Sequence, residues 1–336
     1  MKKHSFIARV IIPLLFLAGC DWPETVVTSI VHPDGSVTRK VVMKNDKQEI
    51  SPSAYRVPVD STWGRSVTME MREQDTVWVF TFEKTFASVD EINAAYKADT
   101  GQNRMLRRSA EFTRRFRWFN TFYRFSEKVE NTLNTELKAE DFLNEEELKY
   151  FYMPSPMFDS LLNSPDSLHY KEIATHMEEK EEEYASRALL NEWAHYYLSL
   201  NPDSAYIYAR LDSLMEKSLP GMSEDSAFIL VLGEDYYRKH KADIDTAGSM
   251  LGKAFDQSFS GKFYTCEIVM PAGLVATNGF VGDDGKISWP VESKHYMSQD
   301  YVMWAESKQV NRWAWIVSGF FILFVLAGLV VKVVRK

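Results

Sequence analysis

The sequence predicts an α+β protein, with an antiparallel sheet built from its N- and C-terminal segments, a helical insertion between them, and one C-terminal transmembrane helix. Three observations predict this class. Apolar and polar residues alternate as in strands before residue 139 and again after residue 259. Helical periodicity fills residues 140–258. An uncharged apolar run extends from Trp313 to Val331, which is long enough to cross a bilayer.

Residues 1–19 have the features of a bacterial lipoprotein signal peptide. Two lysines precede the apolar run Val10 to Phe16, and Leu17-Ala18-Gly19-Cys20 resembles a lipobox. We therefore expect cleavage before Cys20 and lipidation of its sulfur, with palmitate among the acyl chains. The alternative is an ordinary signal peptide followed by a chance cysteine. Asp21 resembles the signal that retains lipoproteins in the inner membrane of enteric bacteria.

Residues 20–139 are predicted to form the β-rich N-terminal half of a membrane-proximal domain. Two hairpins are expected, with strands at Thr25 to Val31, Val37 to Met43, Ser66 to Met71 and Thr76 to Phe86. In the last strand Trp78, Phe80 and Phe82 alternate with smaller residues, so we expect them to face the core. Ser88-Val89-Asp90-Glu91 is typical of a capping box that opens a short helix.

The segment from Arg104 to Lys128 is basic and aromatic, with a local net charge of +6. One interpretation is a site for an anionic ligand or lipid headgroup with aromatic walls, in which Arg114, Arg117, Trp118 and Tyr123 bind the ligand. The other is a long central strand, buried on both faces, whose arginines pair with acidic residues of the insertion.

Residues 140–258 are predicted to be an acidic helical insertion. Residues 140–192 carry 14 acidic and 4 basic side chains. The expected helices begin at Asn144 and continue over Ser167 to Leu200, Asp203 to Leu219, Ser223 to His240 and Asp245 to Phe259. The run Glu178 to Glu183 is most simply a solvated helix face, although it could also recruit a protein partner.

Residues 259–311 are predicted to return to strands, residues 312–333 to cross the membrane, and residues 334–336 to form a cytoplasmic tail. The expected strands are Phe263 to Met270, Leu274 to Thr277, Lys286 to Trp289 and Tyr301 to Ala305. Trp313 and Trp315 suit a membrane interface, and the basic residues after Val331 indicate the cytoplasmic side. The two β-rich halves should pair near the bilayer, with the lipid holding the N-terminal segment against the same membrane.

Charge and cysteine content limit the function classes. The formal net charge is −8, and the six basic residues in the two terminal segments leave −14 for residues 20–331. Such an acidic body argues against nucleic-acid binding, and against broad binding of anionic lipids, as its main role. With Cys20 lipidated, Cys266 has no disulfide partner, and its position in an apolar strand predicts a buried, inert thiol.

Part of the chain resembles LppM-type bacterial membrane lipoproteins. The resemblance is carried by Val269-Met270-Pro271-Ala272-Gly273, Thr277-Asn278-Gly279 and Gly285-Lys286-Ile287-Ser288-Trp289, followed by a membrane helix, and by the early hairpin His32-Pro33-Asp34-Gly35-Ser36. It covers residues 20–90 and 262–332, and Ala272 interrupts the Met-Pro-Gly step. The resemblance implies an envelope lipoprotein with a lipid-binding-like α/β domain. The segment from Phe116 to Tyr123 also resembles one in uncharacterised Bacteroidetes membrane lipoproteins.

The sequence contains few residues whose spacing suggests catalysis or metal binding. Glu192 and His195 have the i, i+3 spacing of di-metal bundles, but no second such pair exists, and Glu172 with His176 are the nearest further candidates. No nucleophile elbow, phosphate loop or zinc-protease motif is present. We therefore expect no enzyme, no catalytic residues, no metal and no cofactor.

The sequence-level hypothesis is a membrane-tethered envelope lipoprotein of the inner membrane, with its main domain in the periplasm. It would bind membrane lipids or an envelope protein, the latter through its acidic helices. An alternative is a scaffold or tether within a protein complex, and a third possibility is a metal-dependent hydrolase built on Glu192 and His195.

Overall fold

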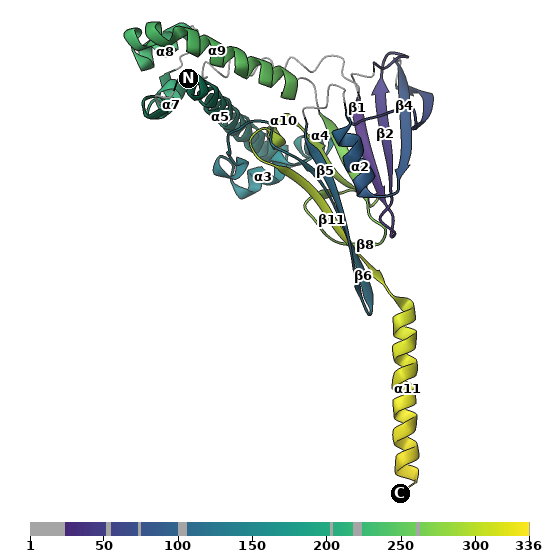
Figure 1. Ribbon diagram of the computed structural model, residues 1–336. Helices are drawn as coiled ribbons and strands as arrows, with labels where there is room; N and C mark the ends of the chain where they lie inside the picture. Colours follow the sequence, from purple (N-terminus) through teal and green to yellow (C-terminus); the bar gives the residue numbers. More distant parts are fainter. Residues whose placement is uncertain are drawn as a thin grey trace.

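A computed structural model describes residues 24–51, 55–72, 75–99, 106–201, 204–217, 224–259 and 263–335. The signal peptide, Cys20 and Asp21 lie outside these residues. The described chain forms a body of two β-sheets, a helical segment beside it, and one long apolar helix that extends from the body (Figure 1). The protein is thus α+β, with sheets that are mostly antiparallel.

The larger sheet has seven strands in the order β3-β4-β2-β1-β7-β10-β9. Both predicted N-terminal hairpins are confirmed, and Phe80 and Phe82 are buried as expected. The strands are β1 (Glu24–Val31), β2 (Val37–Asn45), β3 (Gly64–Arg72), β4 (Asp75–Phe86), β7 (Tyr264–Val269), β9 (Phe280–Val281) and β10 (Ile287–Val291).

The smaller sheet has four strands in the order β5-β6-β11-β8, namely β5 (Arg108–Arg117), β6 (Asn120–Val129), β8 (Gly273–Thr277) and β11 (Tyr301–Val310). The expectation of one long strand within Arg104 to Lys128 was wrong. Arg117 pairs with Asn120, so the chain reverses at Trp118 and Phe119 and forms a hairpin. Its arginines are exposed near this turn and do not pair with the helical insertion.

N- and C-terminal segments pair in both sheets. In the smaller sheet β6 pairs with β11 in antiparallel register, from Asn120 opposite Val310 to Val129 opposite Tyr301. In the larger sheet β1 pairs with β7 in parallel. The two halves therefore build two sheets rather than the single sheet that was expected. The β1–β7 pair is parallel, which is possible because the long helical insertion precedes β7, whereas a tight turn would give antiparallel strands.

The hydrophobic core lies between the two sheets. Val27, Phe80 and Ile268 from the larger sheet pack in one cluster with Phe125 and Met303 from the smaller sheet. Cys266 belongs to this cluster and is fully buried, and burial raises the pKa of its thiol, as expected for an inert cysteine. Helix α2 (Val89–Lys97) lies against β5, where the Asn93 side chain exchanges two hydrogen bonds with the Ala110 backbone.

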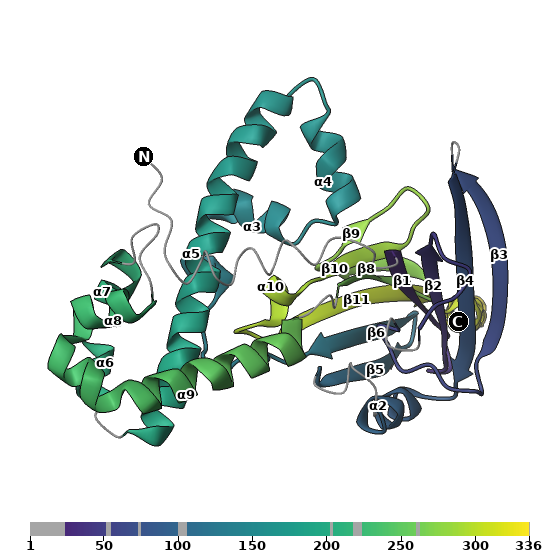
Figure 2. The ribbon, with the colours of Figure 1, turned by 90° about the horizontal axis from the view of Figure 1, so that it is seen from above.

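The helical segment has a second core of its own. Tyr184, Trp193 and Tyr197 of α5 form its centre together with residues of α7 and α9. Seen from above, α5 and α9 reach sideways beyond the two sheets (Figure 2). The elements are η3 (Ala139–Asp141), α3 (Glu145–Phe151), α4 (Ser155–Leu162), α5 (Ser167–Leu200), α6 (Ser204–Tyr208), α7 (Leu211–Lys217), α8 (Glu224–Leu232) and α9 (Glu234–Phe259).

The 34-residue helix α5 confirms the prediction for Ser167 to Leu200, but the next helices differ. The expected helix from Ser223 to His240 breaks at Gly233, which has a φ of +84°. This left-handed conformation ends α8, because glycine adopts it without steric cost. Helix α9 then continues to Phe259 without the expected interruption before Asp245.

After the short helix α10 (Ser293–Tyr296) and β11, the chain enters α11 (Arg312–Val334). This helix is long and apolar enough to cross a membrane, with a mean hydropathy of 2.6, and 6% of its most apolar stretch is buried against the rest of the protein. Its length and exposure fit the predicted transmembrane helix. The helical segment and the Glu24 end of β1 lie at the opposite end of the body from α11 (Figure 1).

Candidate functional site

The tip of the β5–β6 hairpin docks on the start of α11, and Asn311 fixes this contact. Its backbone N–H donates to the Phe119 carbonyl oxygen at 2.9 Å. Its side-chain amide donates to the carbonyl oxygens of Arg117 at 2.9 Å and Trp118 at 3.2 Å. Its side-chain oxygen accepts from the Thr121 hydroxyl at 3.0 Å. Because Asn311 is 8% exposed, these bonds are shielded from water.

Aromatic rings of the hairpin tip and of α11 form a collar around the junction. We define the collar as five residues, of which three belong to the hairpin tip and two to α11: Phe116, Trp118, Phe119, Trp313 and Trp315. Ring centroids lie 6.2 Å apart for Phe116 and Trp313, 5.2 Å for Trp118 and Trp313, and 4.4 Å for Phe119 and Trp315. The Trp118 indole N–H also donates to the Ser318 hydroxyl at 2.8 Å.

The collar residues remain between 36% and 58% exposed although they pack on one another. Exposed aromatic rings at the end of an apolar helix are typical of the membrane–water interface, where the ring face is apolar and the indole N–H is polar. The collar therefore marks the level at which α11 would enter a bilayer.

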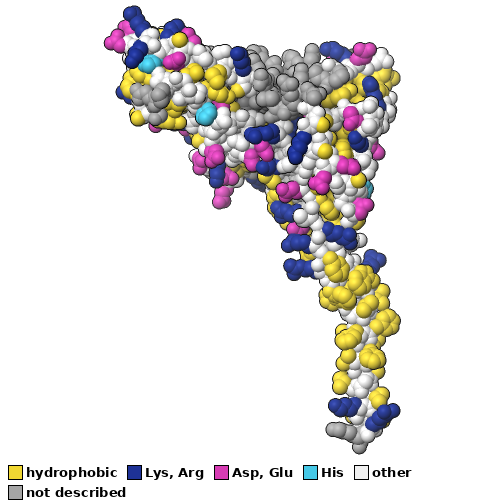
Figure 3. Space-filling model, viewed as in Figure 1, with side chains coloured by type: hydrophobic (Ala, Val, Ile, Leu, Met, Phe, Trp, Pro, Cys, Tyr) yellow, Lys and Arg dark blue, Asp and Glu magenta, His cyan; other side chains and the backbone are white. Residues whose placement is uncertain are grey.

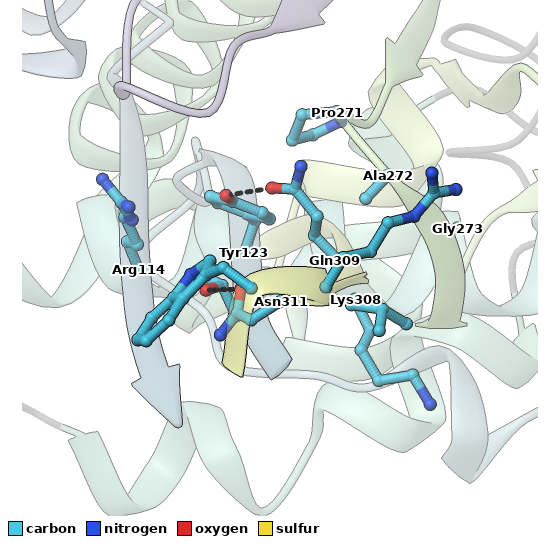
Figure 4. A pocket seen from close by; sticks show the side chains of 12 residues that line it. Arg114, Tyr123, Pro271, Ala272, Gly273, Lys308, Gln309 and Asn311 are labelled. Atoms are coloured by element: carbon cyan, nitrogen blue, oxygen red, sulfur yellow. Dashed lines mark hydrogen bonds between the residues drawn. The ribbon is translucent and has the colours of Figure 1, made fainter. Parts of the chain in front are cut away.

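A hollow of about 720 Å³ opens beside the collar, between the hairpin and the chain that leads into α11 (Figure 4). The Tyr123 hydroxyl donates to the Gln309 side-chain oxygen at 2.7 Å in its wall. We call this hollow the membrane-end groove. It is lined by Arg114, Thr121, Tyr123, Pro271, Ala272, Gly273, Lys308, Gln309, Val310, Asn311, Arg312 and Trp313.

Exposed cations gather around the groove and the collar. Five of them come from β5, β11 and the first residue of α11: Arg114, Arg115, Arg117, Lys308 and Arg312. We call these five cations the basic band, and Figure 3 shows Lys and Arg side chains gathered where the body meets the apolar helix. Arg115 is paired with Glu306 at 3.4 Å, and its side chain remains 60% exposed. The band is thus positive although the body as a whole is acidic.

The four side chains predicted to bind a ligand come together at this end of the protein. Arg114 and Tyr123 line the groove, whereas Arg117 and Trp118 stand at the hairpin turn next to it. The sequence reasoning missed Lys308, Gln309 and Arg312, which complete the groove from about 200 residues away. The sequence did contain a sign of these residues, because basic and amide side chains cluster directly before the apolar run that begins at Trp313.

The candidate metal ligands are not brought together. Glu192 is fully buried and its two oxygens accept hydrogen bonds from the backbone and side-chain amide of Asn134, at 2.7 and 2.8 Å. His195 lies on the exposed face of the same helix. His176 is hydrogen-bonded to Glu147. Among the described residues, no three His, Cys, Asp or Glu side chains are grouped as metal ligands.

The acidic surface of the helical segment is partly neutralised by the protein itself. Within the run Glu178 to Glu183, the Glu181 carboxylate pairs with Lys294 at 3.1 Å and Lys180 pairs with Glu183 at 2.8 Å. Glu178 and Glu179 stay exposed, as a solvated face requires. Helix α4 has no buried residue, and Leu168 at the start of α5 is 72% exposed.

Comparison with known proteins gives one distant likeness. No family model and no curated protein matches the chain. Among solved structures, the folded domain of the Mycobacterium tuberculosis protein LppM is similar at 8% sequence identity, covering 87% of this chain and 92% of that domain, with a TM-score of 0.28. This is a distant structural resemblance, and it does not establish the family.

Proposed function

We propose that this protein is a membrane-anchored envelope protein that binds anionic phospholipid headgroups at the membrane-end groove. The observation that carries the proposal is the docking of the basic, aromatic hairpin tip on the first turn of α11. That contact supports headgroup binding beside the point where α11 would enter a bilayer.

Charge and shape both favour a lipid headgroup over a soluble ligand. Each Lys or Arg close to an anionic membrane surface contributes roughly 1 kcal/mol to association. The five cations of the band therefore favour phosphatidylglycerol-type headgroups, while the body charge of −14 disfavours general attraction to the surface. The guanidinium of Arg114 suits bidentate binding of a phosphate within the groove. The hydroxyl and amide groups that line the groove can satisfy further headgroup oxygens.

Lipid counting around the full-length protein tests this proposal. The protein would be placed in nanodiscs of phosphatidylcholine and phosphatidylglycerol, and the lipids retained by the released protein counted by native mass spectrometry. We expect retained phosphatidylglycerol to exceed its share in the nanodisc. Replacing both arginines, Arg114→Gln with Arg117→Gln, should weaken this preference by about 30-fold, since each removes roughly 1 kcal/mol.

A matched control is Arg238→Gln, which removes an arginine that is 75% exposed on α9, far from α11. It should leave the lipid preference unchanged. Retention of both lipids in the nanodisc ratio by the wild-type protein would refute the proposal.

The anchoring and its cellular place are also part of the proposal. The membrane is the bacterial inner membrane, the body lies in the periplasm, and Cys20 carries a lipid, as the lipobox and the basic residues after α11 favour. Mass analysis of the mature N-terminal peptide tests the lipid. An unmodified peptide that begins at Cys20, or a retained signal peptide, would contradict it.

A second candidate function is a scaffold that recruits an envelope protein through the helical segment. The exposed Leu168, the helix α4 without buried residues and the exposed carboxylates of Glu178 and Glu179 favour it. Crosslinking in cells from α4 and α5 would detect fixed protein neighbours.

A binding function of either kind requires no catalysis. Metal analysis of the purified protein and of its His195→Ala variant tests the hydrolase alternative.

A further inference from the structure

Three arginines are buried at the end of the body opposite to α11, between the two sheets. Arg39 and Arg56 are each 2% exposed and Arg108 is 8% exposed. Glu127, a buried carboxylate of this core, already has its partners. One of its oxygens binds Arg39 at 2.6 Å and the other accepts the Tyr96 hydroxyl at 2.5 Å. Glu127 therefore pairs directly with Arg39, and its charge also helps to raise the pKa of Arg108 without a hydrogen bond between the two side chains.

Within the part of the chain that the structure describes, the Arg108 guanidinium has no hydrogen-bond acceptor. Its Nε, Nη1 and Nη2 atoms are all buried without a partner there. The group lies between two phenol rings, 5.5 Å from the Tyr96 centroid and 5.4 Å from the Tyr264 centroid. These cation–π contacts offset part of the desolvation of the charge, but they leave the N–H donors unused. An anion that accepts from these N–H groups would stabilise the buried guanidinium, because buried donors without acceptors are costly.

Two phenol hydroxyls near Arg108 are buried as well. The hydroxyls of Tyr264 and Tyr301 are buried and have no hydrogen-bond partner. Arg108 and Tyr301 lie in one row of the smaller sheet, each paired with Val129 on β6, while Tyr264 comes from the larger sheet. Burial raises the pKa of both phenols well above 10, so both keep a proton to donate.

Arg56 brings a second positive charge close to this group. Burial lowers its pKa to about 10, and the charge of Arg108 contributes to that shift. The positive charge of Arg56 would add to the electrostatic attraction of an anion to Arg108.

We propose that Arg108, Tyr264 and Tyr301 form a buried site for a phosphate-type oxyanion, either free or as part of a headgroup. The guanidinium supplies the planar pair of donors that fits two oxygens of such an anion, and the phenols supply donors for further oxygens. This site is separate from the membrane-end groove, because Arg108 and Arg117 stand at opposite ends of β5, roughly 30 Å apart at 3.3 Å per residue.

Thermal unfolding of the full-length protein in non-ionic detergent tests the site, with inorganic phosphate as the probe and chloride at equal ionic strength as the reference. For the wild-type protein we expect the midpoint to rise by about 5 °C at a hundredfold excess over the dissociation constant. The Arg108→Met variant should lose this rise. Its midpoint in chloride should equal or exceed that of the wild type, because an unpaired buried charge is gone.

Arg107→Met is the matched control, since Arg107 is the preceding residue and its side chain is 72% exposed. It should keep the full response to phosphate. If the methionine variant does not fold, Arg108→Lys serves instead: it keeps the charge, loses the planar fork and should bind phosphate at least tenfold more weakly.

A second probe, dihexanoyl phosphatidylglycerol below its micelle concentration, separates the two sources of the anion. Stabilisation by inorganic phosphate assigns the site to a small free anion, and stabilisation by the lipid alone assigns it to a headgroup. The proposal is overturned if neither probe stabilises the wild-type protein. It is also overturned if the Arg108 variants respond as the wild type does.

Discussion

Replacing Asn311 by alanine should release the hairpin tip from α11. The substitution removes three hydrogen bonds of the side chain, which join it to Arg117, Trp118 and Thr121 over 2.9 to 3.2 Å. Each such bond contributes about 1 kcal/mol net, so local opening of the tip should become easier by about 2 to 3 kcal/mol. The backbone N–H bond to Phe119 remains.

Hydrogen exchange of the full-length protein in nanodiscs measures this opening. A change of about 2 to 3 kcal/mol corresponds to exchange about 30- to 150-fold faster for the amides of the hairpin tip. Amides in the core of β6 near Phe125 should exchange at the wild-type rate. The matched control is Asn163→Ala on the helical segment, which removes one exposed asparagine bond far from the collar. Unchanged exchange at the tip in Asn311→Ala would refute the idea that this residue couples the hairpin to the helix.

Three further expectations follow from the fold. Burial lowers the pKa of His295 from 6.5 to about 4, so between these pH values the unfolded chain binds a proton that the folded protein does not. The free energy of unfolding should therefore fall by about 3 kcal/mol as the pH drops through this window. Urea titrations measure this fall, and it should be much weaker for His295→Gln. Gly279→Ala should destabilise the protein by about 1 to 3 kcal/mol, because a Cβ there would lie 2.3 Å from the Trp289 ring, and its thermal midpoint checks this. A fluorophore on Glu24→Cys should escape quenching by nitroxide lipids in the bilayer that holds α11, and strong quenching there would show that both ends of the body reach one membrane.

The last expectation tests the prediction that the lipid and α11 hold the protein to one bilayer surface, since Cys20 lies outside the described residues. Thr25 neighbours Tyr264 across the β1–β7 pair, and Tyr264 lies under Arg108, about 30 Å along β5 from the hairpin tip. The four residue steps from Cys20 to Glu24 span at most about 14 Å. A lipid on Cys20 could therefore enter the bilayer that holds α11 only if Glu24 lies near that bilayer, which the label at Glu24 tests.

The sequence predicted the strands well where one face is apolar and the turn is marked. Asp34-Gly35 marks the first hairpin, and Gly35 adopts the positive φ of +94° that such a turn requires. The turn at Trp118 and Phe119 was missed because neither residue is a turn former and aromatic residues continue on both sides. Aromatic residues on both faces of a strand indicate, from the sequence alone, a strand that is buried on both sides. Their actual partners on α11 lie nearly 200 residues further along the chain.

The buried charges had a signal that periodicity could reveal. Arg39 occupies the inward-facing position between Val37 and Val41, and Glu127 stands between the buried Phe125 and Val129. A charged residue at an inward-facing position of a strand, where its neighbours two residues away are apolar, indicates a buried partner. The identity of that partner depends on which strands face each other, and the pattern of a single strand does not contain this information.

The depth of the hairpin tip in a bilayer tests the central claim most directly. A fluorophore on Arg117→Cys of the full-length protein reports this depth through quenching by nitroxides placed at the headgroup or along the acyl chain, and the buried Cys266 should remain unlabelled. The same label on Met69→Cys, 57% exposed on β3, is the control for a surface away from the membrane. We expect strong quenching by the headgroup nitroxide at position 117 and none at position 69. Equal or absent quenching at both positions would contradict a membrane-bound collar and the lipid site built beside it.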